Sequence, residues 1–341
     1  MKQESPHRRG RAAGVVAITD GAAGNERQAL SLALAMRVSP RVLRIALRAP
    51  WRWIGPGFTR GASLSILRWQ WQTLSAPWPA LAIGCGRHAA VITRALREAS
   101  GGATYAVQIL DPRVDPAHFD LVVAPRHDGL EGDNVIQTIG SLNPVDDAWL
   151  AEAKVEFSTL QQLPQPRTAL LVGGRRHGLN MDDAWFGALL ARLEQWRERD
   201  GGSMLVTTSR RTPPEWRERL RSALKNGTTC FWGGEADGAN PYPGYLAVAD
   251  RIVVTPDSVN MLSEACATGA PVFTSLPADP PAKLAALHAE LVDQGWLHDI
   301  HAEFSRAHQP PPLREMAMVA SKVWHRIEAT RADVAVALEA T

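Results

Sequence analysis

Residues 251–275 read RIVVTPDSVNMLSEACATGAPVFTS, and this stretch predicts a strand, a helix and a second strand. The apolar run RIVV ends at polar residues, and a helical segment runs from about Val259 to Thr268. Gly269 and Pro271 then supply the stop signals expected at the end of a helix. A second apolar run, PVFTS, follows. This order of elements is typical of a βαβ unit with parallel strands.

The same alternation of short apolar runs and longer helical segments extends over the whole chain. It lapses only around residues 155–167, where the polar, proline-containing stretch VEFSTLQQLPQPR indicates an interdomain linker. We therefore predict an α/β protein with two Rossmann-like, doubly wound domains facing a cleft. Residues 1–155 would form the N-terminal domain and residues 156–312 the C-terminal domain. Residues 313–341 would form a C-terminal helix, for which a crossing back to the N-terminal domain is one option.

Charge is distributed unevenly along the 341 residues, although the net charge is only +2. Residues 1–100 carry 15 basic and 4 acidic side chains, a net charge of +11. The remaining residues carry 22 and 31, a net charge of −9. No nucleic-acid-reading motif accompanies the basic part. We therefore expect an anionic partner other than nucleic acid for this part.

The three cysteines, Cys85, Cys230 and Cys266, lie far apart and form no CxxC pair. This pattern argues against a disulfide framework and against a structural zinc site, and we expect neither a metal nor a cofactor. No run of about 18 apolar residues occurs, so no membrane-spanning helix is expected. The apolar stretch near the N-terminus is too short for a signal peptide. We expect a cytoplasmic protein, with peripheral attachment to the inner face of the cytoplasmic membrane as an alternative.

The helix that begins after Ser258 is the strongest candidate for a ligand site. Free backbone N–H groups and the positive end of the helix dipole suit a diphosphate. Glu264 lies six residues beyond Ser258, which is roughly 9 Å along a helix axis. That separation fits a nucleotide whose ribose hydroxyls are bound by the carboxylate. The alternative is that Asp257 or Ser258 is only an N-cap and Glu264 a solvated helix residue.

Two further strand ends in the second half carry residues suited to phosphate. Glycines let the backbone approach phosphate oxygens, and hydroxyl and guanidinium groups bind them. Because three strand ends then offer such groups at one sheet edge, their convergence supports a phosphate site, although solvated arginine pairs are common. The residues are Gly173, Gly174, Arg175, Arg176 and His177 after one strand, and Ser209, Arg210 and Arg211 after the other.

The loop after the first strand predicts an acceptor site in the first half. Asp20 ends the strand, Gly21 and Gly24 permit a tight loop, and Asn25 is positioned to cap the next helix. The alternative is an ordinary strand–helix turn. Catalytic candidates farther along are His127 and its neighbour Asp128, which follow the strand at 120–125. A histidine beside a carboxylate is a plausible general base for an acceptor hydroxyl, and a locally bonded loop histidine is the alternative.

A dinucleotide fingerprint is a competing interpretation of the stretch LAIGCGRHAA. Gly84, Gly86 and Ala89 fit GxGxxA, and Asp111 closes the following strand where a ribose-binding acid would lie. Two strand–helix units precede the stretch, however, whereas this fingerprint normally opens its domain. Arg87 and His88, within the same stretch, are candidates for the acceptor side. No GxSxG, HExxH or P-loop pattern occurs.

Residues 41–72 hold six arginines, four tryptophans and no acidic residue. Tryptophan and arginine together suit the boundary between lipid tails and headgroups, so this region is a candidate membrane patch. The alternative is that several of the tryptophans are core residues. The four are Trp51, Trp53, Trp69 and Trp71.

Seven motifs occur in an order that resembles bacterial members of the mitochondrial-fission (elongated mitochondria) family. They are TDGAAGNERQA (19–29), LAIGCGRHAA (81–90), VVAPRHD (122–128), GSLNP (140–144), LLVGG (170–174), TTSRRTP (207–213) and the most specific, residues 240–272. Bacterial relatives are often labelled nucleoside-diphosphate-sugar epimerases. The family is similar in turn to GT-B glycosyltransferases, including the N-acetylglucosaminyltransferase of peptidoglycan synthesis.

The resemblance implies a sugar-nucleotide donor site in the C-terminal domain and an acceptor site in the N-terminal one. The implied residues are Gly173, Gly174, Ser258, Val259 and Asn260 for the diphosphate, Glu264 for the ribose, and Phe231 beside the base. No motif fixes the catalytic base, for which Asp20 and His127 are candidates.

The expected function is metal-independent transfer of a sugar from a nucleoside diphosphate to a lipid-linked or cell-envelope acceptor at the cytoplasmic membrane face. One alternative is a nucleoside-diphosphate-sugar epimerase. The other is a non-catalytic, membrane-associated fission or division factor on the same scaffold.

Overall fold

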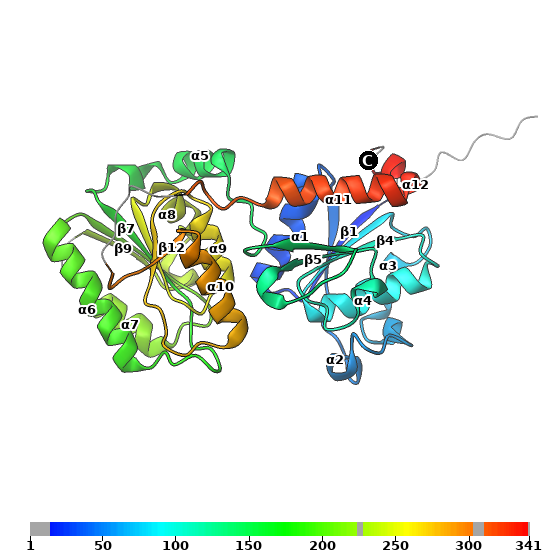
Figure 1. Cartoon of the computed structure of the whole chain (residues 1–341), viewed down its shortest axis with the longest axis horizontal. Coiled ribbons are helices and arrows are strands. Elements are labelled where there is room, and N and C mark those ends of the chain that lie inside the picture. The colour runs from blue at the N-terminus through cyan, green and yellow to red at the C-terminus, as the bar shows by residue number, and fades with distance from the viewer. Residues whose placement is uncertain (1–13, 224–227, 303–309, 340–341) are drawn as a thin grey trace, which may run out of the picture. The chain divides into compact units, whose positions relative to one another are not determined.

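The computed structural model describes residues 14–223, 228–302 and 310–339 (Figure 1). Residues 1–13 of the expected first domain and residues 340–341 of the expected terminal helix lie outside the described part. The chain divides into two compact units. The first is Met1–Thr138 with Glu315–Thr341, and the second is Ile139–Arg314. Each unit contains one six-stranded parallel sheet, which confirms the predicted α/β class.

The first unit is built on a sheet with the strand order β2-β1-β3-β4-β5-β6. Its central strands are buried along their whole length, as parallel strands covered on both faces require. The strands are β1 (Val15–Thr19), β2 (Pro40–Arg44), β3 (Leu81–Cys85), β4 (Tyr105–Ile109), β5 (Leu121–Pro125) and β6 (Val135–Thr138).

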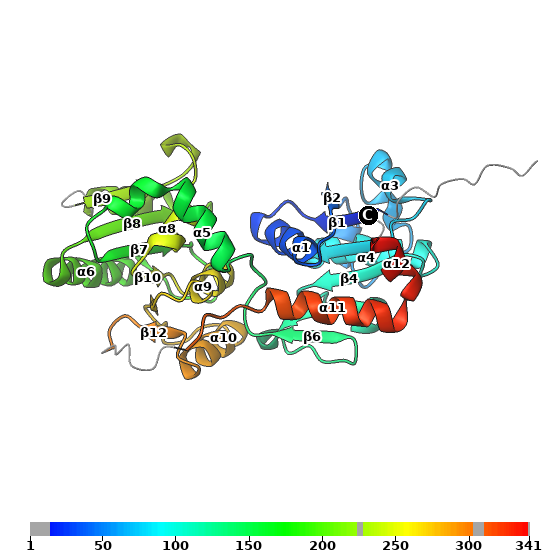
Figure 2. The same cartoon turned by 90° about the horizontal axis from the view of Figure 1, so that it is seen from above.

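The helices of the first unit come from both ends of the chain. They are α1 (Ala23–Ala35), α2 (Trp51–Ile54), α3 (Arg68–Leu74), α4 (Arg87–Ala99), α11 (Met316–Thr330) and α12 (Ala332–Glu339). The late helices are tied to the early ones: the Trp324 indole N–H donates to the carbonyl of Met36 over 3.0 Å. Arg331 in turn bonds to the carbonyl of Gly102. Figure 2 shows α11 and α12 lying against this unit.

The second unit has the strand order β12-β11-β10-β7-β8-β9. The strands are β7 (Arg167–Val172), β8 (Ser203–Thr208), β9 (Thr228–Trp232), β10 (Arg251–Val254), β11 (Val272–Thr274) and β12 (Leu297–Asp299). The helices are α5 (Asp147–Glu156), α6 (Asp183–Asp200), α7 (Pro214–Ala223), α8 (Tyr242–Val248), α9 (Val259–Cys266) and α10 (Ala282–Asp293). The predicted interdomain linker at residues 155–167 is wrong, because α5 packs on α8 and the stretch lies inside this unit; the chain passes from one unit to the other at Thr138 and Ile139 instead of after residue 155.

Strand order reverses direction once in each sheet, and ligands of doubly wound sheets bind beyond the carboxyl ends of the strands at such a switch point. In the second unit the chain runs β7, β8, β9 in one direction and β10, β11, β12 in the other. The switch point therefore lies between β7 and β10. In the first unit it lies between β1 and β3, which pair with Thr19 opposite Cys85.

Candidate functional site

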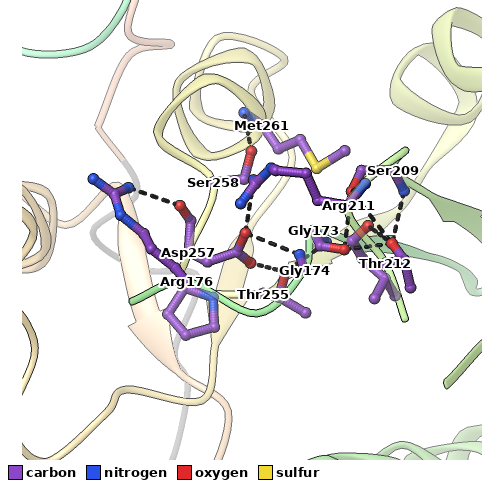
Figure 3. Close-up of polar contacts among 12 residues, drawn as sticks. Gly173, Gly174, Arg176, Ser209, Arg211, Thr212, Thr255, Asp257, Ser258 and Met261 are labelled. Atoms are coloured by element: carbon purple, nitrogen blue, oxygen red, sulfur yellow. Dashed lines mark hydrogen bonds and ion pairs between the residues drawn. The ribbon is translucent and has the colours of Figure 1, made fainter. Parts of the chain in front are cut away.

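At the switch point of the second unit, the loop after β7 lies beside the loop between β10 and α9. Gly173 and Gly174 follow β7, and Thr255 and Asp257 follow β10. The Thr255 hydroxyl accepts a hydrogen bond from the Gly173 amide over 2.7 Å and donates one to Asp257 over 2.7 Å. The two loops are therefore bound to each other by backbone and side-chain hydrogen bonds (Figure 3).

Asp257 is the centre of this arrangement, although the sequence indicates it only as a possible helix cap. Its side chain has no exposed surface. It accepts a hydrogen bond from the Gly174 amide over 3.0 Å and pairs with the Arg211 guanidinium over 2.7 Å. Arg176 donates to the Asp257 carbonyl over 3.0 Å. A buried carboxylate is tolerated when it is paired and hydrogen-bonded in this way.

The glycines after β7 are required by packing within the protein. A Cβ on Gly173 would lie 2.3 Å from the Asp257 carboxylate oxygens, and one on Gly174 would lie 2.2 Å from the carbonyl oxygen of Arg211. Their amides donate to Thr255 and Asp257. That these two glycines contact a diphosphate stays a prediction.

The arginines beside the switch point differ in what they contact. Arg176 and Arg211 both contact Asp257. Arg175 instead pairs with Asp183 over 2.9 Å and with Glu215 over 3.4 Å, away from Asp257. The sequence offers all four arginines as phosphate-binding candidates, with Arg175 and Arg210 as the first choice after each strand, and no pattern in it distinguishes them from Arg176 and Arg211.

Ser209 and Arg210 follow β8, as expected. The Ser209 hydroxyl donates to the carbonyl of Gly173 over 2.9 Å, so it fixes the loop after β7. Arg210 is exposed. Phe231 lies on β9 at the sheet edge, with the Arg221 guanidinium 4.6 Å from its ring centroid. Three strand spacings, about 14 Å, separate β9 from β10. A contact between Phe231 and a base stays a prediction.

Helix α9 starts at this edge with Ser258 as its N-cap, whose hydroxyl accepts from the Met261 amide at 3.5 Å. Val259 and Asn260, the first two helical residues, are half-buried. Their amides belong to the first turn of the helix, where N–H groups have no partner within the helix. These amides, with Arg176 and Arg211, form a positively polarised edge.

Glu264 on α9 is buried, with an exposed fraction of 4%, which contradicts its interpretation as a solvated helix residue. The Tyr242 hydroxyl, at the start of α8, donates a hydrogen bond to its carboxylate. Ser263 beside it accepts a hydrogen bond from the Ser141 amide over 2.9 Å. The sequence does not indicate Tyr242. A phenol from a separate helix thus fixes the orientation of Glu264.

The switch point of the first unit brings Asp20 close to Gly86. Asp20 accepts hydrogen bonds from the Ala22 amide and from the Asn25 side chain, both over 3.0 Å. Gly86 has a φ of +85°, and a Cβ there would lie 2.6 Å from the Asn25 amide nitrogen. The prediction that Asn25 caps the helix is wrong: Ala22 is the N-cap, and Asn25 lies within the first turn beside Gly24. Gly21 has a φ of +77°, as a tight loop requires.

The two candidates for the base do not lie together. His127 and Asp128 form part of a 3₁₀ turn directly after β5. Strands β3 and β4 separate β5 from β1, so Asp20 and His127 belong to strand ends about 14 Å apart. At that separation they cannot act on the same proton, because a general base must lie within hydrogen-bond reach of it.

Arg87 and the glycines of the GxGxxA pattern have structural partners. The Arg87 guanidinium donates to the carbonyls of Trp53 and Gly55 over 2.7 and 3.0 Å. A Cβ on Gly84 would lie 2.2 Å from the Thr93 hydroxyl, so this glycine permits close packing of α4 on β3. His88, the second residue of α4, is half-buried.

The tryptophans of the candidate membrane patch face two directions. Trp51 and Trp71 are partly buried against the core of the first unit, so including them in an exposed patch is wrong. Trp53 and Trp69 are exposed, with fractions of 68% and 56%. No helix among the described residues is long and apolar enough to cross a membrane.

Two surface hollows lie away from both switch points. One of about 490 Å³ is lined by residues before β7, β10 and β11, at the amino ends of these strands. The other, of about 770 Å³, lies between β6 and α11. We place the candidate site at the carboxyl ends because doubly wound sheets bind ligands there. Within the described ranges, no three His, Cys, Asp or Glu side chains are grouped so as to hold a metal ion.

Residues 23–327 match the model of a family described as mitochondrial fission ELM1. The chain is 29% identical over 289 residues to the mitochondrial fission protein ELM1 of Arabidopsis thaliana, covering 76% of this chain and 66% of that one. It is 26% identical over 242 residues to the uncharacterized protein RP120 of Rickettsia prowazekii, covering 58% and 65%. The chain thus spans about two thirds of the length of these curated relatives.

Solved structures show that the fold is GT-B-like. A putative UDP-N-acetylglucosamine 2-epimerase from Listeria monocytogenes superposes with a TM-score of 0.57 at 13% identity, covering 94% of this chain and 98% of that one. The UDP-GlcNAc 2-epimerase of Neisseria meningitidis, bound to UDP-GlcNAc, superposes with a TM-score of 0.53 at 12% identity, covering 95% of this chain and 94% of that one. Sucrose-phosphate synthase from Thermosynechococcus elongatus superposes with a TM-score of 0.51 at 13% identity, covering 93% of this chain and 99% of that one.

Proposed function

The chain belongs to the mitochondrial fission ELM1 family, and from this membership and the site geometry we propose that it binds a nucleoside-diphosphate sugar at the switch point of its second unit. The observation that carries the proposal is the placement of Arg176, Arg211 and the first amides of α9 at one end of that helix, with the buried Glu264 farther along it. Positive groups at one end suit the diphosphate, and the carboxylate suits the ribose hydroxyls.

Asp257 does not prevent phosphate from binding at this edge. Its negative charge is already balanced by Arg211 and by hydrogen bonds from Thr255 and Gly174. The Arg176 guanidinium donates to the Asp257 carbonyl, and no carboxylate in the described part of the chain forms an ion pair with it, so its charge is available to a ligand. The structural relative that carries UDP-GlcNAc supports a nucleotide sugar as the ligand class.

The reaction we propose is transfer of the sugar to a lipid-linked or cell-envelope acceptor bound by the first unit, without a metal ion. The leaving diphosphate would be stabilised by the α9 amides and by Arg176. Asp20 or His127 would take the acceptor proton. We further propose that the reaction takes place at the cytoplasmic face of the membrane, where such acceptors occur.

Thermal unfolding in the presence of UDP, GDP, ADP or CDP tests the binding step. A ligand at about 100 times its Kd stabilises the folded state by about 2.7 kcal/mol, which raises the Tm measurably. We expect such a rise with one of the four nucleotides and its loss in Glu264→Gln. Glu198→Gln, the same change on an exposed part of α6, is the matched control. If none of the four nucleotides shifts the Tm, the donor-site proposal is wrong.

Epimerisation of a nucleotide sugar is the second candidate, because two of the superposed structures are named as UDP-GlcNAc 2-epimerases. The two reactions differ in what they need. An epimerase changes the sugar nucleotide with no acceptor present, whereas a transferase releases nucleoside diphosphate only with an acceptor. The sugar nucleotide is incubated with the protein alone and the products are then quantified by chromatography. A changed sugar nucleotide indicates an epimerase, and an unchanged one indicates a transferase.

A non-catalytic fission or division factor is the third candidate, since the family is described by its role in mitochondrial fission. Such a protein would retain its cellular role when the donor site is disabled. Complementation of a deletion strain by Glu264→Gln tests this, with the Glu198→Gln variant as the control. Full complementation by Glu264→Gln would favour the non-catalytic role.

A further inference from the structure

The segment between β2 and β3, residues 45–80, exposes an unusual group of apolar side chains. Of eleven large apolar side chains that are exposed among the described residues, six lie here, with exposed fractions from 43% to 69%. Single exposed apolar residues are normal, but a group of them marks an interaction surface. The six are Trp53, Ile54, Phe58, Leu64, Leu67 and Trp69.

The opposite side of the segment packs on the core of the first unit. Trp51, Ile66, Trp71 and Leu74 contact the cluster formed by β1, β2, β3 and α4. Gln70 is also buried and donates to the carbonyl of Arg44 over 2.7 Å. Because these side chains fill the inner side, the six exposed ones face away from the core.

Helix α4 holds the first part of the segment in place. Arg94 donates to the carbonyl of Pro56 over 2.9 Å, and the Thr59 hydroxyl donates to Glu98 over 2.7 Å. With the bonds from Arg87 to Trp53, the segment is fixed from the first to the last turn of α4. Side chains held on an ordered backbone lose less conformational freedom when they bind.

Positive charge is interleaved with the exposed apolar residues. Arg48, Arg52, Arg60 and Arg68 are exposed, and no described carboxylate forms an ion pair with any of them. No acidic residue occurs between Glu26 and Glu98. Both of these are engaged, since Glu26 pairs with Arg44 over 2.6 Å and Glu98 with Arg94 over 2.8 Å.

We propose that the outer side of this segment docks on an anionic lipid bilayer. Tryptophan and other apolar side chains enter the headgroup boundary, and arginines bind lipid phosphates at the same depth. Arg52 precedes Trp53 and Arg68 precedes Trp69, so the two kinds of residue are mixed rather than separated. A second copy of this segment would set arginine against arginine, because no acidic residue occurs between Glu26 and Glu98, whereas an anionic bilayer supplies the opposite charge.

The docking surface adjoins the switch point of the first unit. Arg87, which holds Trp53, begins α4 directly after β3, and β3 is the neighbour of the strand that ends before Asp20. A lipid-linked acceptor would therefore meet this edge when the protein is docked. Docking itself does not rest on nucleotide binding, and the two can fail separately.

Co-sedimentation with vesicles tests the proposal. The full chain is mixed with vesicles of phosphatidylcholine alone or of phosphatidylcholine and phosphatidylglycerol in equal parts. We expect sedimentation with the anionic vesicles only, decreasing as salt is added. The variant W53S/W69S should stay in the supernatant. L34S/V336S, which alters two exposed apolar residues elsewhere in the same unit, should sediment like the unaltered chain.

The arginines are tested separately by R52Q/R68Q, for which the vesicle affinity should fall roughly fivefold per arginine. A protein that does not sediment with anionic vesicles, or a W53S/W69S variant that sediments unchanged, overturns the proposal. Sedimentation velocity without lipid tests whether the surface instead binds a second copy of the chain. If the unaltered chain is a dimer and W53S/W69S is a monomer, the surface binds a second copy and the lipid assignment is wrong.

Discussion

The backbone amide of Gly174 donates a hydrogen bond over 3.0 Å to the buried carboxylate of Asp257, 83 residues later in the chain. Through this contact the loop after β7 and the loop before α9 behave as one piece. Arg211 closes the arrangement from the β8 side. The candidate nucleotide site is therefore built around a protein carboxylate, and its stability should depend on that carboxylate fitting closely against two glycines.

Replacement of Gly173 by alanine should destabilise the protein by about 1–3 kcal/mol, since the new Cβ would overlap the Asp257 carboxylate. Urea unfolding measures the loss. Gly14→Ala is the control, because no atom lies within 4 Å of a Cβ there. Its effect should stay within about 0.5 kcal/mol. Equal stability of the two variants would show that the loops after β7 and β10 shift easily.

Tyr242→Phe separates the support of Glu264 from its proposed role in binding. The change removes one hydrogen bond to the buried carboxylate and should cost about 1.5–3 kcal/mol of stability. The carboxylate itself remains, so the rise in Tm on adding nucleotide should persist, unlike in Glu264→Gln. Scanning calorimetry with and without ligand measures both quantities. Loss of the rise in Tyr242→Phe would mean that the phenol, rather than the carboxylate alone, is needed for binding.

Asp200 at the end of α6 predicts a pH-dependent contribution to stability. A hydrogen bond from Arg199, aided by one from Arg251, lowers the pKa of Asp200 from 3.8 to about 2. The carboxylate therefore stabilises the folded state above the unfolded pKa, and this contribution is lost as the pH falls from about 4 toward about 2. Solvent screens the pair, so we expect about 1 kcal/mol.

Unfolding of Asp200→Asn should thus be easier than that of the unaltered chain at neutral pH, with the difference narrowing in acid. Glu198→Gln, on an exposed part of the same helix, serves as the control. A difference that stays constant from neutral pH to below the unfolded pKa of Asp200 would assign the effect to packing rather than to charge.

The three cysteines should differ in reactivity. Cys85 and Cys266 are buried and Cys230 on β9 is half-buried. Burial raises the pKa of all three thiols, that of Cys266 to about 12. A thiol reagent should therefore label Cys230 first in the folded protein, and the other two only on unfolding. Mass spectrometry of the labelled peptides checks the order, and fast labelling that persists in Cys230→Ser would contradict it.

Regular elements of the second unit were predictable from the sequence. The helix expected from about Val259 to Thr268, with stop signals at Gly269 and Pro271, is present as α9 and ends within two residues of the expected position. Strand β6 and helix α5 were not predicted. β6 has only four residues and lies at a sheet edge, so it lacks the apolar run that marks a buried strand.

The sequence predicts which side chains face the core only where apolar residues recur at a regular helix or strand spacing. Trp51 and Trp53 are both in a four-residue helix, and no pattern of that length tells which of them faces the core. The same holds for Arg175 and Arg176, which share a loop but contact different carboxylate or carbonyl groups. Such choices depend on residues far away in the chain, which the local sequence does not contain.

The tie between α11 and the first unit affects the order in which the chain folds during synthesis. All residues of the second unit leave the ribosome before α11 does, so that unit has its complete set of strands first. The sheet of the first unit is made earlier, but the hydrogen bond from Trp324 to Met36 forms only after α11 has been synthesised. The unit at the start of the chain is thus the last to be completed. During that interval the side of α1 that packs on α11 in the folded protein is uncovered.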